Sequence, residues 1–170
     1  MIIAWLDCFL NFFVPIANLF TLIFFADNVV QPDDIKAFLE SRWVAEVKEY
    51  FQMATTGDTI TKRHTLAMRN YLIFTLLLHN GQRSGAIQNL RLRAYRYAME
   101  RDGGFVMTVA HHKTALQGAV TLCIPKDIMH QLNIYIRRVR LHHPHINESH
   151  SEDDSPVFLS YGEDSIPTQM

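Results

Sequence analysis

Two cationic side chains in this 170-residue sequence have types and neighbours that suit chemistry at phosphate. Arg83 lies in the run NGQRSGAIQNL, and Lys113 lies in the run HHKT. A guanidinium is always charged and binds two oxygens at once, so it suits the extra negative charge of a phosphorane better than an ammonium does. An ammonium at a hairpin tip is mobile and can donate a proton once docking removes its water. The structural alternatives are an arginine that bridges helices in a core and a solvated turn lysine.

The residue pattern predicts which elements position these two side chains. Apolar residues at helical spacing predict a buried helix that stops at Asn80-Gly81, and a short helix with a serine cap follows directly after Arg83. Two alternating apolar runs predict a β-hairpin, and its polar loop contains Lys113. The expected order is helix, short helix, hairpin and helix, with the approximate bounds 64–78, 84–90, 105–111 paired with 120–124, and 127–141.

These motifs in this order resemble the first half of a tyrosine recombinase (phage-integrase-like) catalytic domain. The wording around Arg83 is most similar to the recombinases of eukaryotic mobile elements. The resemblance runs from about Lys62 to Tyr161. It implies a mostly α fold with a small β-hairpin or sheet (α+β), which would be a partial catalytic core of the DNA breaking-rejoining enzymes.

The resemblance also implies roles for individual residues. Arg83 matches the family arginine that grips the scissile phosphate, and Lys113 matches the hairpin lysine that protonates the departing 5′-hydroxyl. His112 and Thr114, beside that lysine, are expected to contact DNA. The implied activity is DNA binding, recombination and integration, with no cofactor, a nuclear location and action as a homo-oligomer.

The sequence departs from the family pattern at several positions. Many members have an acidic residue three positions after the first arginine, where this chain has Ala86. No H-x-x-R follows Lys113, and Tyr161 precedes the place of the second arginine, so it does not match the tyrosine nucleophile. Strand cleavage needs an attacking group placed by both arginines, so these residues alone are not expected to be catalytic.

Charge is strongly segregated along the chain. Residues 62–143 carry 13 Lys and Arg against 3 Asp and Glu, whereas residues 1–61 carry 3 against 8 and residues 144–170 carry none against 6. The net charges are therefore −5, +10 and −6 in chain order. A basic middle block suits a polyanion such as nucleic acid. The alternative is a basic face that the chain's own acidic tail shields.

A second basic cluster follows the short predicted helix. It consists of Arg91, Arg93 and Arg96, with Tyr95 and Tyr97 between them. Phosphate contacts from Arg91 and Arg93 would add affinity that depends on salt and not on sequence. An ordinary solvated loop between helix and hairpin is an equal alternative.

The first 61 residues divide into two segments that precede the recombinase-like region, 62–170. Residues 1–28 form a hydrophobic segment, and Met1 to Ala26 is long enough to span a bilayer. Asp7 and the central Pro15 weaken that interpretation, as does the absence of a basic flank. Residues 29–61 are expected to form one amphipathic helix, from about Ile35 to Met53, and a connector.

Neither the cysteines nor the histidines support a metal site. Cys8 and Cys123 are far apart and fit no zinc spacing. Four histidines crowd around Pro144, but they lie in an acidic segment with no cysteine.

Two other classes of function compete with the recombinase interpretation. One is a non-catalytic DNA or protein interaction module, and the other is a membrane-anchored protein held through residues 1–26. In each case the segment Pro156 to Tyr161 is expected to be incompletely buried, because the family's later helices normally cover it.

Overall fold

The computed structural model describes residues 32–81, 84–109, 119–142 and 152–159. The chain divides into two compact units, Met1–Glu49 and Tyr50–Met170. Helix α3 (Pro32–Leu39) belongs to the first unit, and α4 (Arg42–Thr56) runs from the first into the second. The prediction of one helix from Ile35 to Met53 was wrong. The chain turns at Glu40-Ser41, and the Ser41 hydroxyl accepts a hydrogen bond from the Val44 N–H (3.3 Å), as a helix cap does.

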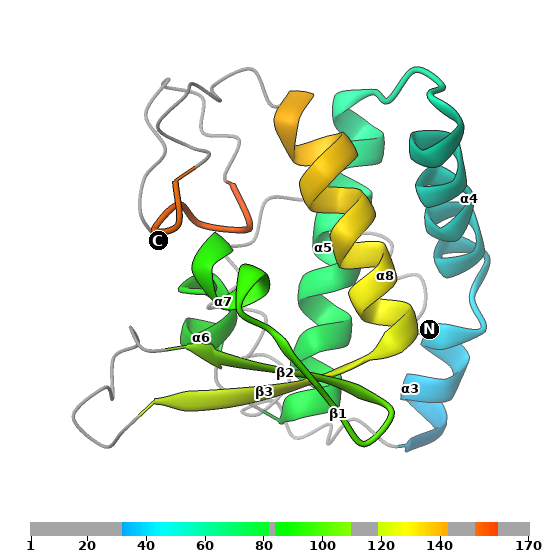
Figure 1. The fold of residues 1–170 in the computed structure, drawn as a ribbon. Coiled ribbons are helices and arrows are strands. Elements are labelled where there is room, and N and C mark those ends of the chain that lie inside the picture. The colour runs from blue at the N-terminus through cyan, green and yellow to red at the C-terminus, as the bar shows by residue number, and fades with distance from the viewer. Residues whose placement is uncertain (1–31, 82–83, 110–118, 143–151, 160–170) are drawn as a thin grey trace. The chain divides into compact units, whose positions relative to one another are not determined.

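In its described residues, the second unit contains the end of α4, a long helix, two short helices, a three-stranded sheet and a final helix (Figure 1). Its further elements are α5 (Lys62–Asn80), α6 (Ser84–Gln88), α7 (Leu92–Arg96), β1 (Met99–Arg101), β2 (Gly104–Val109), β3 (Val120–Pro125), α8 (Lys126–Ile134), a π-helical turn (Tyr135–Val139) and a 3₁₀ turn (Arg140–His142). The strands are antiparallel in the order β1-β2-β3. The expected α+β class with a small sheet is confirmed.

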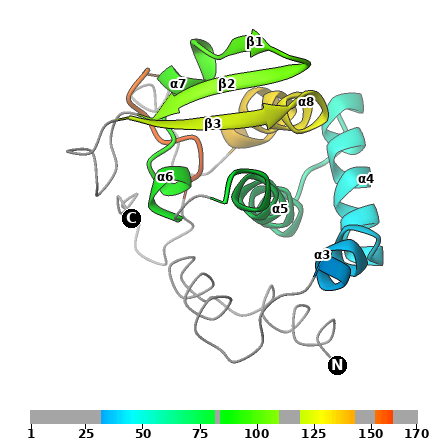
Figure 2. The same cartoon turned by 90° about the horizontal axis from the view of Figure 1, so that it is seen from below.

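Helices α5 and α8 lie on the same face of the sheet (Figure 2). The alternation of apolar and polar residues along the strands determines which face the helices cover, because successive side chains of a strand point to opposite sides. Met107 and Val109 of β2 and Leu122 and Ile124 of β3 are buried, whereas the paired Thr108 and Thr121 on the other face are exposed. The core side chains that are at most 2% exposed include Met68, Leu72, Leu76, Ile87, Leu90, Met107, Leu122, Ile124, Ile128, Leu132 and Val139.

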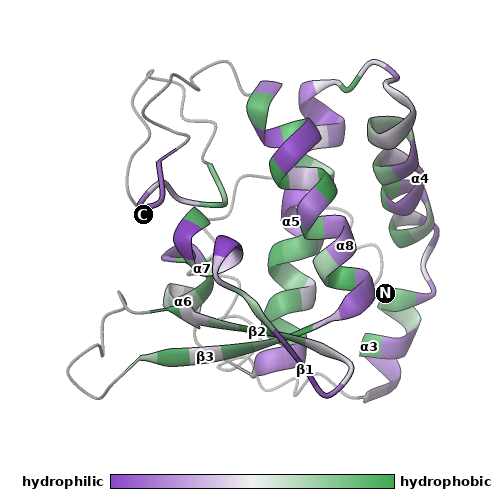
Figure 3. Cartoon of the chain, viewed as in Figure 1, coloured by the Kyte–Doolittle hydropathy of each residue, from purple (hydrophilic) through white to green (hydrophobic). Residues whose placement is uncertain are grey.

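Helix α5 changes character along its length. Its first half is hydrophilic and its second half hydrophobic, and the hydrophobic half packs beside the sheet (Figure 3). Thr61 caps its start in a reciprocal capping box with His64. Gly81 ends it in the left-handed conformation (φ 55°), and its N–H donates to the Leu77 carbonyl (2.9 Å). The predicted stop at Asn80-Gly81 is confirmed.

The predicted hairpin and final helix are present, but two neighbouring elements were missed. Strand β1 pairs with β2 through the two-residue turn Asp102-Gly103, where both residues have positive φ. Asp-Gly is a strong hairpin signal, so the sequence did contain it. Helix α7 was missed because its five residues are too few for a helical period to show.

Candidate nucleic-acid interface

The four residues expected at the centre of a recombinase site lie outside the described residues. They are Arg83, His112, Lys113 and Thr114. The elements on either side of them are described. Arg83 directly precedes α6, and the other three belong to the connection from Val109, where β2 ends, to Val120, where β3 begins.

These flanking elements lie at one end of the sheet. Figures 1 and 2 both place α6 beside the end at which β2 stops and β3 starts. Helix α6 also packs against α5, which in turn contacts β3. The Asn80 side chain joins them further, since its Oδ1 accepts a hydrogen bond from the Cys123 N–H (2.7 Å). The fold therefore brings α6, the end of β2 and the start of β3 to the same end of the sheet.

Helix α7 presents the second basic cluster next to this end. Arg91 begins the helix and forms an isolated β-bridge with Pro156. Arg93 and Arg96 are exposed and lie three residues apart, which places them on one face of the helix. Within the described ranges, the side chains of Arg91 and Arg93 have no ion-pair partner. Arg96 differs, because its Nη1 pairs with the Asp153 carboxylate.

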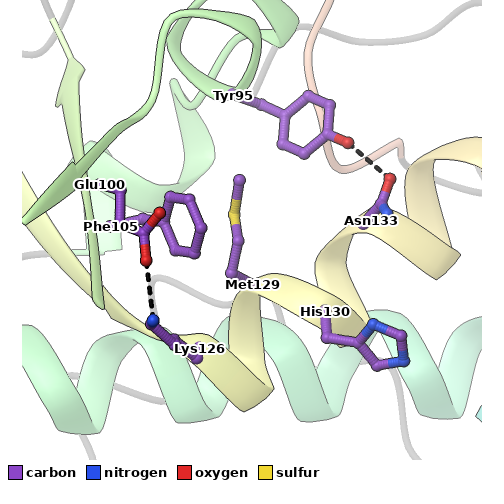
Figure 4. A pocket seen from close by; sticks show the side chains of 7 residues that line it. All are labelled: Tyr95, Glu100, Phe105, Lys126, Met129, His130 and Asn133. Carbon is purple, nitrogen blue, oxygen red and sulfur yellow. Dashed lines mark hydrogen bonds and ion pairs between the residues drawn. The ribbon is translucent and has the colours of Figure 1, made fainter. Parts of the chain in front are cut away.

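The two tyrosines of the cluster have different surroundings. The Tyr95 hydroxyl donates to Asn133 Oδ1 on α8 (2.7 Å), which ties α7 to that helix (Figure 4). Tyr97 is 69% exposed. Tyr95 therefore positions α7, and Tyr97 is free to meet a partner.

Tyr95 also lines an open hollow of about 380 Å³ between β1, β2 and α8 (Figure 4). Phe105 and Met129 supply apolar side chains, and Lys126 Nζ pairs with Glu100 Oε1 at its edge (2.7 Å). Because these two charges neutralise each other, the hollow offers no net charge to a phosphate.

Residues 152–159, which we call the strap, run across α7 (Figure 1). The Leu92 N–H donates to the Ser155 carbonyl (2.9 Å), and the Arg93 N–H donates to the Asp153 carbonyl (2.8 Å). The Val157 N–H donates in the other direction, to the Leu90 carbonyl (2.8 Å). The first two bonds satisfy N–H groups that the first turn of α7 leaves without helical partners.

Two arginines hold the strap from the other side. Arg140 donates through Nε (3.2 Å) and Nη2 (2.8 Å) to the Pro156 carbonyl, and Arg69 Nη1 donates to the Leu159 carbonyl (2.7 Å). Arg140 is only 2% exposed. Burial lowers its pKa, and the nearby Arg96 adds to this, whereas Tyr135 opposes it. Arginine stays charged in proteins, so its two bonds to one carbonyl are charge-assisted.

The strap corrects one expectation. Val157 and Leu159 were expected to be incompletely buried, yet they are 0% and 4% exposed. Pro156 and Phe158, beside and between them, are only partly buried, as expected. Ser160 and Tyr161, the rest of that segment, lie outside the described residues.

The alternatives based on metals and membranes gain no support from the described part of the chain. There, no three His, Cys, Asp or Glu side chains gather into a group that could hold a metal ion. Among the same residues, no helix is both long and apolar enough to cross a membrane. The hydrophobic segment 1–26 and the histidines from 143 onward are not among them.

Comparisons with known proteins place no constraint on this site. No protein-family model matches the chain, and neither a curated protein nor a solved structure matches it. The assignment of function therefore depends on the motifs and on the geometry described above.

Proposed function

We propose that residues 62–170 are a nuclear DNA-binding domain related to the first half of a tyrosine recombinase. One observation carries the proposal. Three described features lie at the same end of one small sheet: helix α6, which directly follows Arg83, helix α7 with its exposed arginines, and the strand ends that flank the connection containing Lys113. A phosphate backbone is a row of negative charges, so cations gathered at one end suit it better than cations spread over the surface.

In this proposal Arg91 and Arg93 contact backbone phosphates and position the duplex. Phosphate contacts set register and orientation without reading bases, so binding has little sequence preference. Arg83 and Lys113 then lie at the phosphate between the helix and the hairpin. Cleavage would still need a second arginine and a nucleophile, which no motif after Lys113 supplies. We propose that this chain binds DNA, as a homo-oligomer on paired sites, and does not cleave it alone.

The test is binding of the full chain to random-sequence duplex DNA across a salt series. Each phosphate contact contributes a slope of about −0.9 in log affinity against log salt. Arg93→Gln is expected to make the slope of log affinity against log salt less steep by about 0.9. Between 50 and 200 mM salt, the variant should therefore lose about 3.5-fold less affinity than the natural chain does. Arg101→Gln is the matched control, because this exposed arginine ends β1 at the opposite end of the sheet.

The outcomes separate the proposal from its competitors. Equal effects of Arg93→Gln and Arg101→Gln would mean diffuse attraction to a basic surface, and no binding at low salt would refute the proposal. Lys113→Ala and Arg83→Ala are expected to reduce the slope as well. Cleavage of a nicked substrate, restored by adding a fragment with a second arginine and a tyrosine, would distinguish a recombinase half from a plain DNA-binding module.

A further inference from the structure

Arg96 is the one cation of the α7 cluster that a described carboxylate neutralises. Its partner, Asp153, lies 57 residues further along the chain, in the acidic block that follows the basic domain. The side chains are 46% and 41% exposed, so a phosphate can reach the place where the carboxylate lies. A carboxylate offers a guanidinium the same kind of charged oxygens as a phosphate.

The strap fixes this carboxylate in place. Its backbone forms hydrogen bonds with Leu90, before α7, and with the first two residues of α7. The guanidiniums of Arg69 and Arg140 bind the Leu159 and Pro156 carbonyls. Val157 is fully buried and anchors the same segment by packing. The backbone that carries Asp153 is therefore already ordered beside Arg96, so forming the ion pair costs little further conformational entropy.

We propose that the strap is an autoinhibitory element, in which Asp153 occupies Arg96 in place of a nucleic-acid phosphate. The inference rests on the proposed DNA-binding function and adds its regulation. Duplex DNA must displace the Asp153 carboxylate before it gains the Arg96 contact. Arg91 and Arg93 stay available, so the strap lowers affinity without abolishing it.

The arrangement also predicts what relieves the inhibition. Removing the Asp153 charge abolishes the ion pair with Arg96, while the Asp153 carbonyl keeps its bond to the Arg93 N–H. Asp153→Asn is therefore expected to leave the strap docked. It should raise affinity for random-sequence duplex DNA at 50 mM salt about two- to fivefold, the range expected for loss of one exposed ion pair. The salt slope should become steeper by about 0.9, because one more phosphate contact forms.

Two further variants show whether the effect is local. Glu152→Gln removes the same charge from the adjacent exposed residue, which has no ion pair with a described residue, so it should change affinity much less. In an Arg96→Gln background, Asp153→Asn should have little effect, since the competing cation is gone. All variants are made in the full chain and compared by circular dichroism and thermal unfolding.

Each result has one meaning. Equal gains from Asp153→Asn and Glu152→Gln, or a full gain in the Arg96→Gln background, would overturn the autoinhibitory contact and leave the DNA-binding proposal intact. Lower affinity in Asp153→Asn would overturn it as well, because the strap would then assist binding. If neither the natural chain nor any variant binds duplex DNA at low salt, the proposed function itself is wrong. If Asp153→Asn fails to fold, Asp153→Ser gives the same comparison.

Discussion

Replacing Gly81 with alanine tests the turn that leads from α5 towards α6. Gly81 has φ 55°, and a Cβ added there would meet nothing within 4 Å. The cost is therefore one of backbone conformation alone, about 1–2 kcal/mol for an L-residue in the left-handed region. Alanine also restricts the unfolded chain, and this lower conformational entropy offsets about 0.4–1 kcal/mol of the cost. We expect Gly81→Ala to lower the free energy of unfolding by about 1 kcal/mol.

Gly85 provides a matched control with the opposite sign. It lies within α6, and a Cβ there also meets nothing within 4 Å. Alanine is favoured over glycine in a helix by about 0.5–1 kcal/mol, so Gly85→Ala should stabilise the protein. The two variants should differ by about 1.5–2 kcal/mol. For a chain of this size, that corresponds to about 3–8 °C in Tm.

The assay is thermal and urea unfolding of the full chain, followed by circular dichroism. Gly81→Asn should lie closer to the natural protein than Gly81→Ala does, because asparagine tolerates the left-handed region. A Gly81→Ala variant as stable as Gly85→Ala would refute the reasoning, since it would mean that the turn before Arg83 does not need this conformation.

Three other substitutions test the surrounding fold. Thr61→Ala should cost about 1 kcal/mol of unfolding free energy in urea because α5 loses its cap, whereas Thr61→Ser should be nearly neutral. Gly104→Ala should destabilise the sheet by about 1–3 kcal/mol, since its Cβ would lie 2.8 Å from the Ile124 carbonyl oxygen; an unchanged Tm would contradict the close approach. Burial raises the pKa of the Tyr71 hydroxyl above its ordinary value of 10.0. The contribution of this hydroxyl to stability is therefore complete below pH 10 and is lost as the pH rises through the folded-state pKa. The free energy of unfolding, measured from pH 8 to 11, should fall less steeply in Tyr71→Phe than in the natural protein.

Local pattern was sufficient for most elements of the second unit. The period of apolar residues predicted α5 and α8, alternation predicted β2 and β3, and Asn80-Gly81 predicted the end of α5. These signals are readable because each is repeated over several residues or belongs to a specific turn. The first unit was less readable, because the helical period continues through Ser41, where the chain turns.

Contacts between residues distant in sequence could not be predicted from local sequence pattern. Arg96 looks like a free surface cation in sequence, but the fold pairs it with Asp153. Arg140 follows two exposed arginines, yet it alone is buried, where it donates to the Pro156 carbonyl. The physical reason is that burial and ion pairing depend on which segments meet, and residue type and period do not carry that information.

For the candidate site as well, sequence and tertiary structure determined different features. The motifs around Arg83 and Lys113 and their resemblance to a recombinase domain singled out these two residues, and the chemistry of a guanidinium at phosphate added the arginines of α7. Packing of α7 against the strap determined the surroundings of the α7 arginines. It also determined that an acidic residue distant in sequence pairs with Arg96, since a backbone held by long-range hydrogen bonds is what brings Asp153 to it.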